Sequence, residues 1–240
     1  MQVDMRVTPV TSLTKFTRWS GLASMLGGLL FAIGIPLHPL RYGEAVKHTP
    51  YSAIHTLIAV ALVLALFGLV GLYVRQAEKL GALGLTGFTI AFFGQALTLG
   101  GLMTEGFMWP AVAQFDPALV HDFDFNSPVG QVITLLAPVF FGGLVLFAVG
   151  FALFGWATWR AGVLPRWSGV LVAIGAVLYT AGGFALPLFG THSFVVTIIE
   201  SSGAIPFGLG FIGMGYALWA GRAGMADVRV AQKQEGNYTR

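Results

Sequence analysis

The chain contains no cysteine and few charged residues. Without cysteine it cannot form disulfides, bind a metal through thiolates or use a cysteine nucleophile. Only 10% of its 240 residues are charged and 56% are hydrophobic, whereas soluble domains carry about 25% charged residues. A chain this apolar has too little polar surface to face water on all sides, so the composition predicts an integral membrane protein in contact with membrane lipid. The formal net charge of +3 is too small to indicate a nucleic-acid partner.

Several motifs that identify a function are also missing. The sequence has no glycine-rich phosphate loop, no GxSxG and no compact metal-binding spacing such as HExxH. No lysine lies within a long apolar stretch, which argues against a retinal Schiff base. No arginine-rich voltage helix or carbonyl filter motif is visible. The absences narrow the function classes without selecting one.

Six apolar stretches are long enough to cross a membrane, since a spanning helix needs about 20 mostly apolar residues. We expect an all-α, polytopic membrane helical bundle, with a six-helix transmembrane domain over residues 1–225 and a polar cytoplasmic tail over 226–240. Residues 194–203 either lengthen the sixth helix or form a re-entrant or interfacial turn. The six stretches are roughly Trp19–Leu37, Ala53–Tyr73, Leu83–Met103, Val132–Trp156, Trp167–Leu188 and Ala204–Leu218.

The basic residues are distributed unevenly between the two sides of this predicted bundle. Eleven of the 13 Lys and Arg residues fall on the side of the termini, and only Arg41 and Lys47 fall on the other. Because short cytoplasmic loops carry the excess of Lys and Arg, this bias predicts that both termini are cytoplasmic. The expected location is the bacterial inner membrane, as a multi-pass protein.

An internal repeat is predicted by the tetrapeptide RWSG, which opens the first helix at Arg18–Gly21 and the fifth at Arg166–Gly169. The third and fifth helices share a stripe of mostly small residues at alternating spacings of four and three, which the first follows loosely. Small residues on one face allow close helix packing in lipid. We therefore expect three parallel helical hairpins, although glycine and alanine are frequent in membrane helices anyway. The stripes are Gly87, Ala91, Gly94, Thr98, Gly101, Glu105; Gly169, Ala173, Ala176, Thr180, Gly183, Pro187; and Gly21, Met25, Gly28, Ala32, Ile35, Pro39.

One carboxylate, Glu105, is set into the apolar segment LTLGGLMTEGFMWP at residues 97–110. It continues the small-residue stripe, so it should point into the bundle, and ionised groups in lipid tend to face the protein interior. Glu200 lies at a comparable depth, and His55 is the expected partner of Glu105. We expect these three residues to line a ligand pocket with Gln95, Trp109 and Gln131. The alternative is a structural cap at the membrane interface.

A metal or haem site is a second hypothesis, because imidazole and carboxylate are the ligands that remain without cysteine. All five histidines fall on the predicted non-cytoplasmic side, and the candidate ligands are His55, His121 and His192. Solvated histidines in loops and at helix ends are the alternative. The cofactor would be haem or a divalent metal, and its identity is open.

The stretch 109–131 is expected to be a long outer loop that covers the mouth of the bundle. It mixes acids and prolines with Phe115, Phe123 and Phe125, a pattern typical of a segment lying on the membrane surface. Loops of this length without their own structure are often functional. The HDFD segment at 121–124 can bind a cation, but its alternation of acid and aromatic also suits an interfacial loop.

Short motifs in most of the chain resemble those of a broad group of uncharacterised bacterial six-helix integral membrane proteins. They are LHP at 37–39, a histidine opening the second helix (His55), GLVGLYVR at 68–75, ExFxWPA at 105–111 and VLPRWSG at 163–169. The resemblance implies the six-helix fold and no particular chemistry.

The function that we expect is binding of a hydrophobic or amphipathic ligand (lipid, quinone, haem or pigment) in a pocket that opens on the non-cytoplasmic side. Three alternatives stay open. They are a haem- or metal-dependent membrane oxidoreductase or hydrolase, an accessory subunit of a larger membrane complex, and a small-molecule transporter. The stripes of small residues would also suit a homo-oligomer. Whether the protein is an enzyme is left open.

Overall fold

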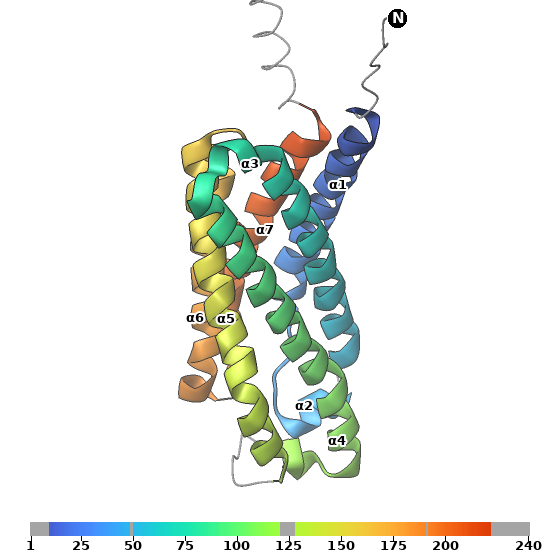
Figure 1. Cartoon of the computed structure of the whole chain (residues 1–240). Coiled ribbons are helices and arrows are strands. Elements are labelled where there is room, and N and C mark those ends of the chain that lie inside the picture. Colours follow the sequence, from blue (N-terminus) through green and yellow to red (C-terminus); the bar gives the residue numbers. More distant parts are fainter. Residues whose placement is uncertain (1–9, 49, 121–127, 191, 222–240) are drawn as a thin grey trace, which may run out of the picture.

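Figure 1 draws the computed structural model of the chain, which describes residues 10–48, 50–120, 128–190 and 192–221. Within these ranges every regular element is a helix and there is no strand. The elements are α1 (Val10–Gly34), α2 (Gly43–His48), α3 (Tyr51–Met103), a π-helical turn (Thr104–Met108), α4 (Trp109–Phe115), a 3-10 turn (Pro117–Val120), α5 (Pro128–Ala161), α6 (Arg166–Phe189) and α7 (Phe194–Trp219).

The longest helix, α3, folds back on itself. Its 53 residues would reach about 80 Å as one straight helix, far beyond the roughly 30 Å hydrocarbon core of a membrane. Gly81 interrupts it with φ 60° and ψ −163°, a backbone conformation that is essentially restricted to glycine. The chain turns there, so α3 consists of a first arm (51–80) and a second arm (82–103) that runs back along the bundle (Figure 1).

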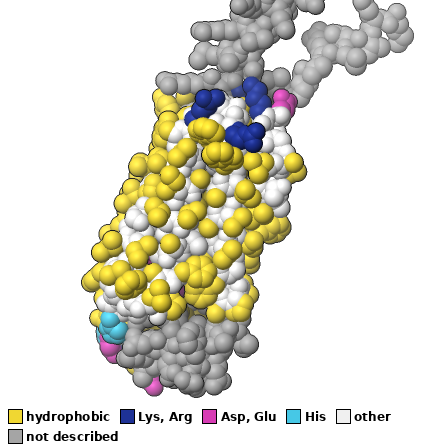
Figure 2. Space-filling view, turned by 90° about the vertical axis from the view of Figure 1, so that its left-hand side faces the viewer, with side chains coloured by type: hydrophobic (Ala, Val, Ile, Leu, Met, Phe, Trp, Pro, Cys, Tyr) yellow, Lys and Arg dark blue, Asp and Glu magenta, His cyan; other side chains and the backbone are white. Residues whose placement is uncertain are grey.

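The outer surface of the bundle is apolar. Five helices in the described part of the chain are long and apolar enough to cross a membrane. Large side chains such as Trp19, Phe93 and Val63 are exposed along them. Figure 2 shows hydrophobic side chains over the flank, with Lys and Arg gathered at the upper end, a histidine at the lower end and acids at both. The predicted all-helical bundle of long apolar helices is confirmed, and these helices are compatible with a membrane.

Glycines bring neighbouring helices into backbone contact. The helices lie in the order α1, first arm of α3, second arm of α3, α5, α6 and α7, and α7 packs on α1 again. A Cβ added to Gly27 would meet the backbone of Ala65, and one added to Gly94 would meet Phe147. Small residues therefore serve helix packing in this fold, as the sequence predicts. The rings that fill the centre are Phe31, Phe147, Phe151, Phe207 and Phe211.

The structure decides one open alternative and contradicts one expectation about irregular segments. Residues 194–203 lengthen the sixth predicted helix and form no re-entrant or interfacial turn, because they are the first part of the continuous helix α7. The expectation of a long loop over 109–131 is wrong, because most of that stretch is helical, comprising α4, the 3-10 turn and the start of α5. The reason is a small second core in which Trp109, Ala113 and Val120 pack against α2 and Tyr51. Phe115 is exposed, and the HDFD segment with Phe123 and Phe125 lies outside the described residues.

Candidate functional site

Three buried charged side chains meet at the end of the bundle where α2 and α4 lie. Arg41, in the segment between α1 and α2, donates from Nε to Glu105 Oε1 over 2.9 Å. Its Nη2 donates to both carboxylate oxygens of Glu200, each at 3.1 Å. Buried charges are tolerated when they are paired and hydrogen-bonded. One guanidinium therefore joins the carboxylate that follows α3 to the carboxylate on α7.

The π-helical turn Thr104–Met108 presents Glu105 to this cluster. Single π turns inside α-helices are frequent at functional sites. Ser52 donates its hydroxyl hydrogen to the carbonyl of Gly106 over 2.8 Å and so ties the turn to the first arm of α3. Gly106 also lies directly against the His55 side chain, where a Cβ would collide with the Cβ of His55. The glycine thus allows the turn to approach the first arm of α3.

Oxygen Oε1 of Glu105 is the atom at which the polar contacts converge. The buried Tyr51 hydroxyl donates to it over 2.9 Å, in addition to Arg41. The Tyr51 ring stacks on His55 with centroids 4.4 Å apart. The two donors to Glu105, Arg41 and Tyr51, and the two imidazoles belong to the short segments 38–41 and 51–55. These two segments therefore supply most of the site.

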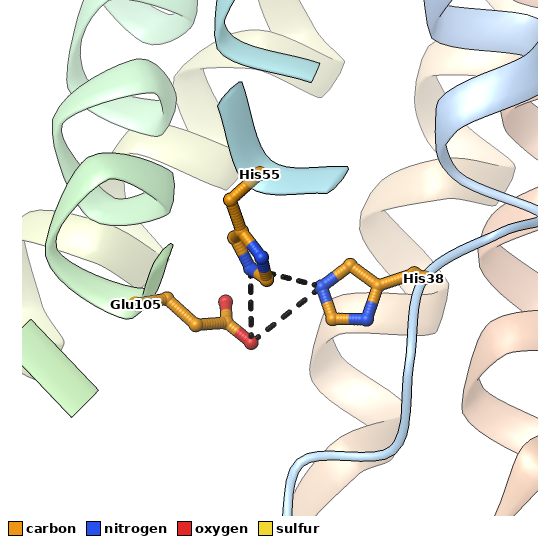
Figure 3. A group of neighbouring side chains, drawn as sticks. All are labelled: His38, His55 and Glu105. Carbon is orange, nitrogen blue, oxygen red and sulfur yellow. Dashed lines mark hydrogen bonds and ion pairs between the residues drawn. The ribbon is translucent and has the colours of Figure 1, made fainter. Parts of the chain in front are cut away.

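His38 and His55 direct their Nε2 atoms at each other and at Glu105 (Figure 3). The two Nε2 atoms are 3.1 Å apart. The distances from Glu105 Oε1 are 3.6 Å to His38 Nε2 and 3.7 Å to His55 Nε2. On the far sides of the rings, Nδ1 of His38 is 2.8 Å from the Pro39 carbonyl oxygen and Nδ1 of His55 is 2.9 Å from that of Tyr51. Of the described residues, these three form the group whose ligand atoms can hold a metal ion.

Burial and nearby charges together determine the charge states of His38 and Arg41. Burial, with the nearby charge of Arg41, lowers the pKa of His38 to about 3, so its imidazole is neutral at ordinary pH. Burial acts to lower the pKa of Arg41 as well, but the carboxylates of Glu200 and Glu105 outweigh it and raise that pKa. The guanidinium therefore stays charged while the imidazole stays neutral.

A pocket of about 330 Å³ lies beside the charged cluster, bounded by the second arm of α3, α5, α6 and α7. Arg41, Glu105 and Glu200 line its polar end. Most of the remaining wall is apolar, including Met108, Leu186 and two phenylalanines of α5. Two wall residues, Leu97 and Val139, are 36% and 51% exposed, so the pocket reaches the outer surface of the bundle between the second arm of α3 and α5.

The structure brings together the three residues at the centre of the predicted site. Glu105 points inward, with His55 beside it, and Glu200 is linked to it through Arg41. Trp109 lines the pocket. Gln95 is buried but donates to the carbonyl of Leu62 over 2.8 Å, so it ties the two arms of α3 together and is not part of the described pocket wall.

Among the described residues, His192 does not join the cluster of His38, His55 and Glu105. Its ring stacks on that of Tyr42, with the centroids 4.2 Å apart. His121 lies outside the described residues, and so does the side chain of Gln131. The expected metal ligands therefore share only His55 with the group that the structure assembles.

Sequence reasoning missed His38, Arg41 and Tyr51 as site residues. A signal for Arg41 was present, because two acids buried in an apolar bundle require a cation, and Arg41 and Lys47 are the two basic residues predicted on their side. His38 and Tyr51 gave no such signal. Both flank segments that look like ordinary helix ends, and only the folding of residues 35–51 across the bundle end brings them to Glu105.

No protein-family model matches the chain, and neither a curated protein nor a solved structure matches it. A function must therefore be argued from the site itself.

Proposed function

We propose that the protein binds an amphipathic, lipid-soluble ligand in the pocket between the second arm of α3, α5, α6 and α7. The observation that carries the proposal is the pocket of about 330 Å³ with Arg41, Glu105 and Glu200 at one end of an otherwise apolar wall. Ligand sites are concave, mostly apolar and contain a few convergent polar groups that orient the ligand. The polar head of the ligand would lie at the charged end and its apolar part between α3 and α5.

The lining favours a lipid or a quinone over haem. No histidine lines the pocket among the described residues, whereas haem iron usually needs an axial ligand from the protein. The Nε2 atoms of His38 and His55 are only 3.1 Å apart, which leaves no room for a porphyrin between them. The guanidinium donates and the carboxylates accept hydrogen bonds, so a head with carbonyl or hydroxyl groups suits this end. The exposed wall residues Leu97 and Val139 favour access from the bilayer.

Gly100 offers a direct test of the pocket. It lines the cavity, and a Cβ added there meets nothing within 4 Å, so Gly100→Leu should fill the pocket without disturbing the helices. Gly142 on α5 is the matched control, because a Cβ there also meets nothing within 4 Å and Gly142 is not a wall residue. Organic extracts of protein purified in mild detergent would be compared by mass spectrometry.

We expect a compound enriched over the bulk lipid in the wild type and in Gly142→Leu, and largely lost from Gly100→Leu. An extract that matches the bulk lipid, or equal ligand content in the two variants, would contradict the proposal.

We further infer six membrane crossings arranged as three parallel hairpins: α1 with the first arm of α3, the second arm with α5, and α6 with α7. The proposal is supported by equivalent contacts within each hairpin. Gly27, Gly94 and Gly175 each abut the backbone of the partner helix, and the nearest backbone atoms belong to Ala65, Phe147 and Phe207. Gly68, Gly150 and Gly210 likewise abut Ser24, Ala91 and Val172.

Contacts between the hairpins favour the same arrangement. Gly21 meets Gly215, and Gly169 meets Gly155. At the third junction the stacked rings of Tyr73 and Phe88, 4.4 Å apart, take the corresponding positions. The contacts therefore align the three hairpins differently from the stripes of small residues. The second arm of α3 is shifted by one residue relative to the alignment that the stripes predict.

In the alignment given by the contacts, Glu105 corresponds to His38 of the first hairpin, rather than to Pro39. The third hairpin has Leu186 there, one residue before Pro187. Two of the three hairpins therefore point a polar side chain at the same central place, which supports a common origin for the site as well as for the helices.

We propose the bacterial inner membrane as the location, with both termini cytoplasmic, because the positive residues gather at the end of the bundle where α1 begins and α7 ends (Figures 1 and 2). The roles of accessory subunit, homo-oligomer and transporter stay predictions. None of them has a specific observation in its favour beyond the small-residue faces, and those are used between helices of this chain.

A further inference from the structure

We propose that His38, His55 and Glu105 bind a first-row divalent metal ion through the two imidazole Nε2 atoms and the Glu105 carboxylate. The proposal goes beyond ligand binding in the pocket and does not depend on it. It is based on the way Nε2 of His38, Nε2 of His55 and Oε1 of Glu105 converge, together with the hydrogen bonds that Nδ1 of each imidazole makes on the far side of the ring.

The Nδ1 contacts determine which nitrogen of each ring is free to bind. A backbone carbonyl can only accept, so the short contacts from His38 Nδ1 to Pro39 and from His55 Nδ1 to Tyr51 require a hydrogen on each Nδ1. A neutral imidazole carries one N–H, so a ring with its hydrogen on Nδ1 presents a lone pair at Nε2. Metal-binding histidines almost always donate their other N–H to a carbonyl or carboxylate in this way, which orients the ring.

The three ligand atoms are spaced as a metal requires. Ligand atoms about 2.1 Å from a tetrahedral metal lie about 3.4 Å apart. The observed separations are 3.1 Å between the Nε2 atoms, and 3.6 and 3.7 Å from each of them to Glu105 Oε1. Without a positive charge between them, two lone pairs and a carboxylate oxygen at these distances repel one another.

The charges of the cluster also favour a bound cation. With neutral imidazoles, Glu105, Glu200 and Arg41 together carry one net negative charge among the described buried residues. A dication between the imidazoles would compensate it. Arg41 holds Glu200 through Nη2 and Glu105 through Nε, so it can keep Glu200 paired when the Glu105 carboxylate turns to the metal.

The ligand set narrows the class of metal. Two imidazoles and a carboxylate suit Zn²⁺, Fe²⁺ and neighbouring metals, whereas Mg²⁺ and Ca²⁺ prefer oxygen ligands. Three protein ligands leave at least one coordination position open, which is typical of catalytic rather than structural metal sites. Because Glu105 also lines the pocket, the metal would lie beside the polar end of the pocket.

The test uses the full chain in mild detergent, treated with a chelator and then titrated with Zn²⁺ alone. The variants are His38→Gln and His55→Gln, and the control is His48→Gln, whose side chain is 67% exposed and lies 3.0 Å from Glu44 on the same short helix. We expect one Zn²⁺ per wild-type chain, unchanged binding in the control, and affinity lower by about 100-fold or more in the variants, since loss of a supporting residue alone costs 10–100-fold.

A second measurement covers the case in which the variants do not fold. Cu²⁺ added to the wild type would be studied by pulsed EPR, which counts coordinated imidazoles, and we expect two, displaced by one equivalent of Zn²⁺. A shared proton between the histidines in place of a metal predicts no stoichiometric binding of either ion. The proposal would be overturned by the absence of stoichiometric binding, or by a single imidazole coordinated to Cu²⁺. It would also be overturned if folded His38→Gln or His55→Gln protein bound Zn²⁺ as tightly as the wild type.

Discussion

Arg41 keeps two buried carboxylates compatible with an apolar bundle. Its guanidinium contacts Glu105 and Glu200 at 2.9 and 3.1 Å, and all three side chains are buried. In a medium with little water, each carboxylate would otherwise lack both a counter-charge and most of its hydrogen bonds. Arg41, one of the two basic residues that the sequence predicts on the outer side, is therefore central to the stability of the site.

Replacing Arg41 with Gln should destabilise the protein by about 3–5 kcal/mol, the usual effect of removing one partner from a buried ion pair. Unfolding in detergent, followed by circular dichroism, measures the loss. Arg41→Gln combined with Glu200→Gln should recover part of it, because one uncompensated charge is removed. Lys47→Gln, a basic residue on the same side of the bundle, is the control and should change little. An Arg41→Gln protein as stable as the wild type would refute the role of the guanidinium.

At the residue scale, the sequence is a good guide to Glu105 and a poor one to its partners. An acid in an apolar stretch is conspicuous because ionised groups are costly in lipid, and its inward direction follows from helical periodicity. His38 and Tyr51 are not conspicuous. Their proximity to Glu105 depends on where the segment between α1 and α3 crosses the bundle end, which no local pattern encodes.

At the element scale, Gly81 makes two antiparallel arms from one 53-residue helix. Its φ of 60° with ψ of −163° lies where a Cβ clashes with its own backbone, so only glycine adopts it readily. The sequence indicates the two stretches on either side but not the sharpness of the connection. A helix that simply ran on would leave the second arm outside the bundle.

Gly81→Ala should destabilise the fold by about 1–3 kcal/mol, through backbone strain alone, because a Cβ at Gly81 meets nothing within 4 Å. Gly100→Ala is the matched control. It lies in the same helix with equally open space and has helical geometry, so alanine there should be neutral or slightly stabilising. Unfolding midpoints of the two variants would be compared, and equal midpoints would show that the turn at Gly81 imposes no special conformation.

At the scale of the whole molecule, the absence of cysteine becomes an experimental advantage. Any cysteine introduced into this chain is the sole thiol. Glu44 lies on α2 at one end of the bundle and Lys79 near the turn of α3 at the other (Figure 1), and both are exposed. If the first arm of α3 crosses the membrane, as we propose, the two positions report opposite sides of it.

A membrane-impermeant maleimide should label Glu44→Cys in spheroplasts, in which the inner membrane is intact. Lys79→Cys should be labelled only after that membrane is permeabilised, since the excess of Lys and Arg predicts its end of the bundle to be cytoplasmic. The reverse pattern would show an inverted orientation. Labelling of both from outside would show that the first arm of α3 does not cross the membrane.

The sequence by itself determines the solvent and the elements of this protein. A chain with 56% hydrophobic and 10% charged residues requires lipid as its surroundings. Lipid in turn requires helices, because their backbone hydrogen bonds are made within each segment. Composition and periodicity are properties of the chain alone, so they can be determined without knowing which helices are in contact.

Only the tertiary structure decides the chemistry. His38, Arg41, His55, Glu105 and Glu200 come from separate segments, and their meeting depends on the turn at Gly81, the π-helical turn after α3 and the crossing of residues 35–51. The tautomers of the histidines depend in turn on the carbonyls of Pro39 and Tyr51. Such contacts join residues far apart in the chain, and angstrom differences in their positions separate a metal site from isolated polar groups.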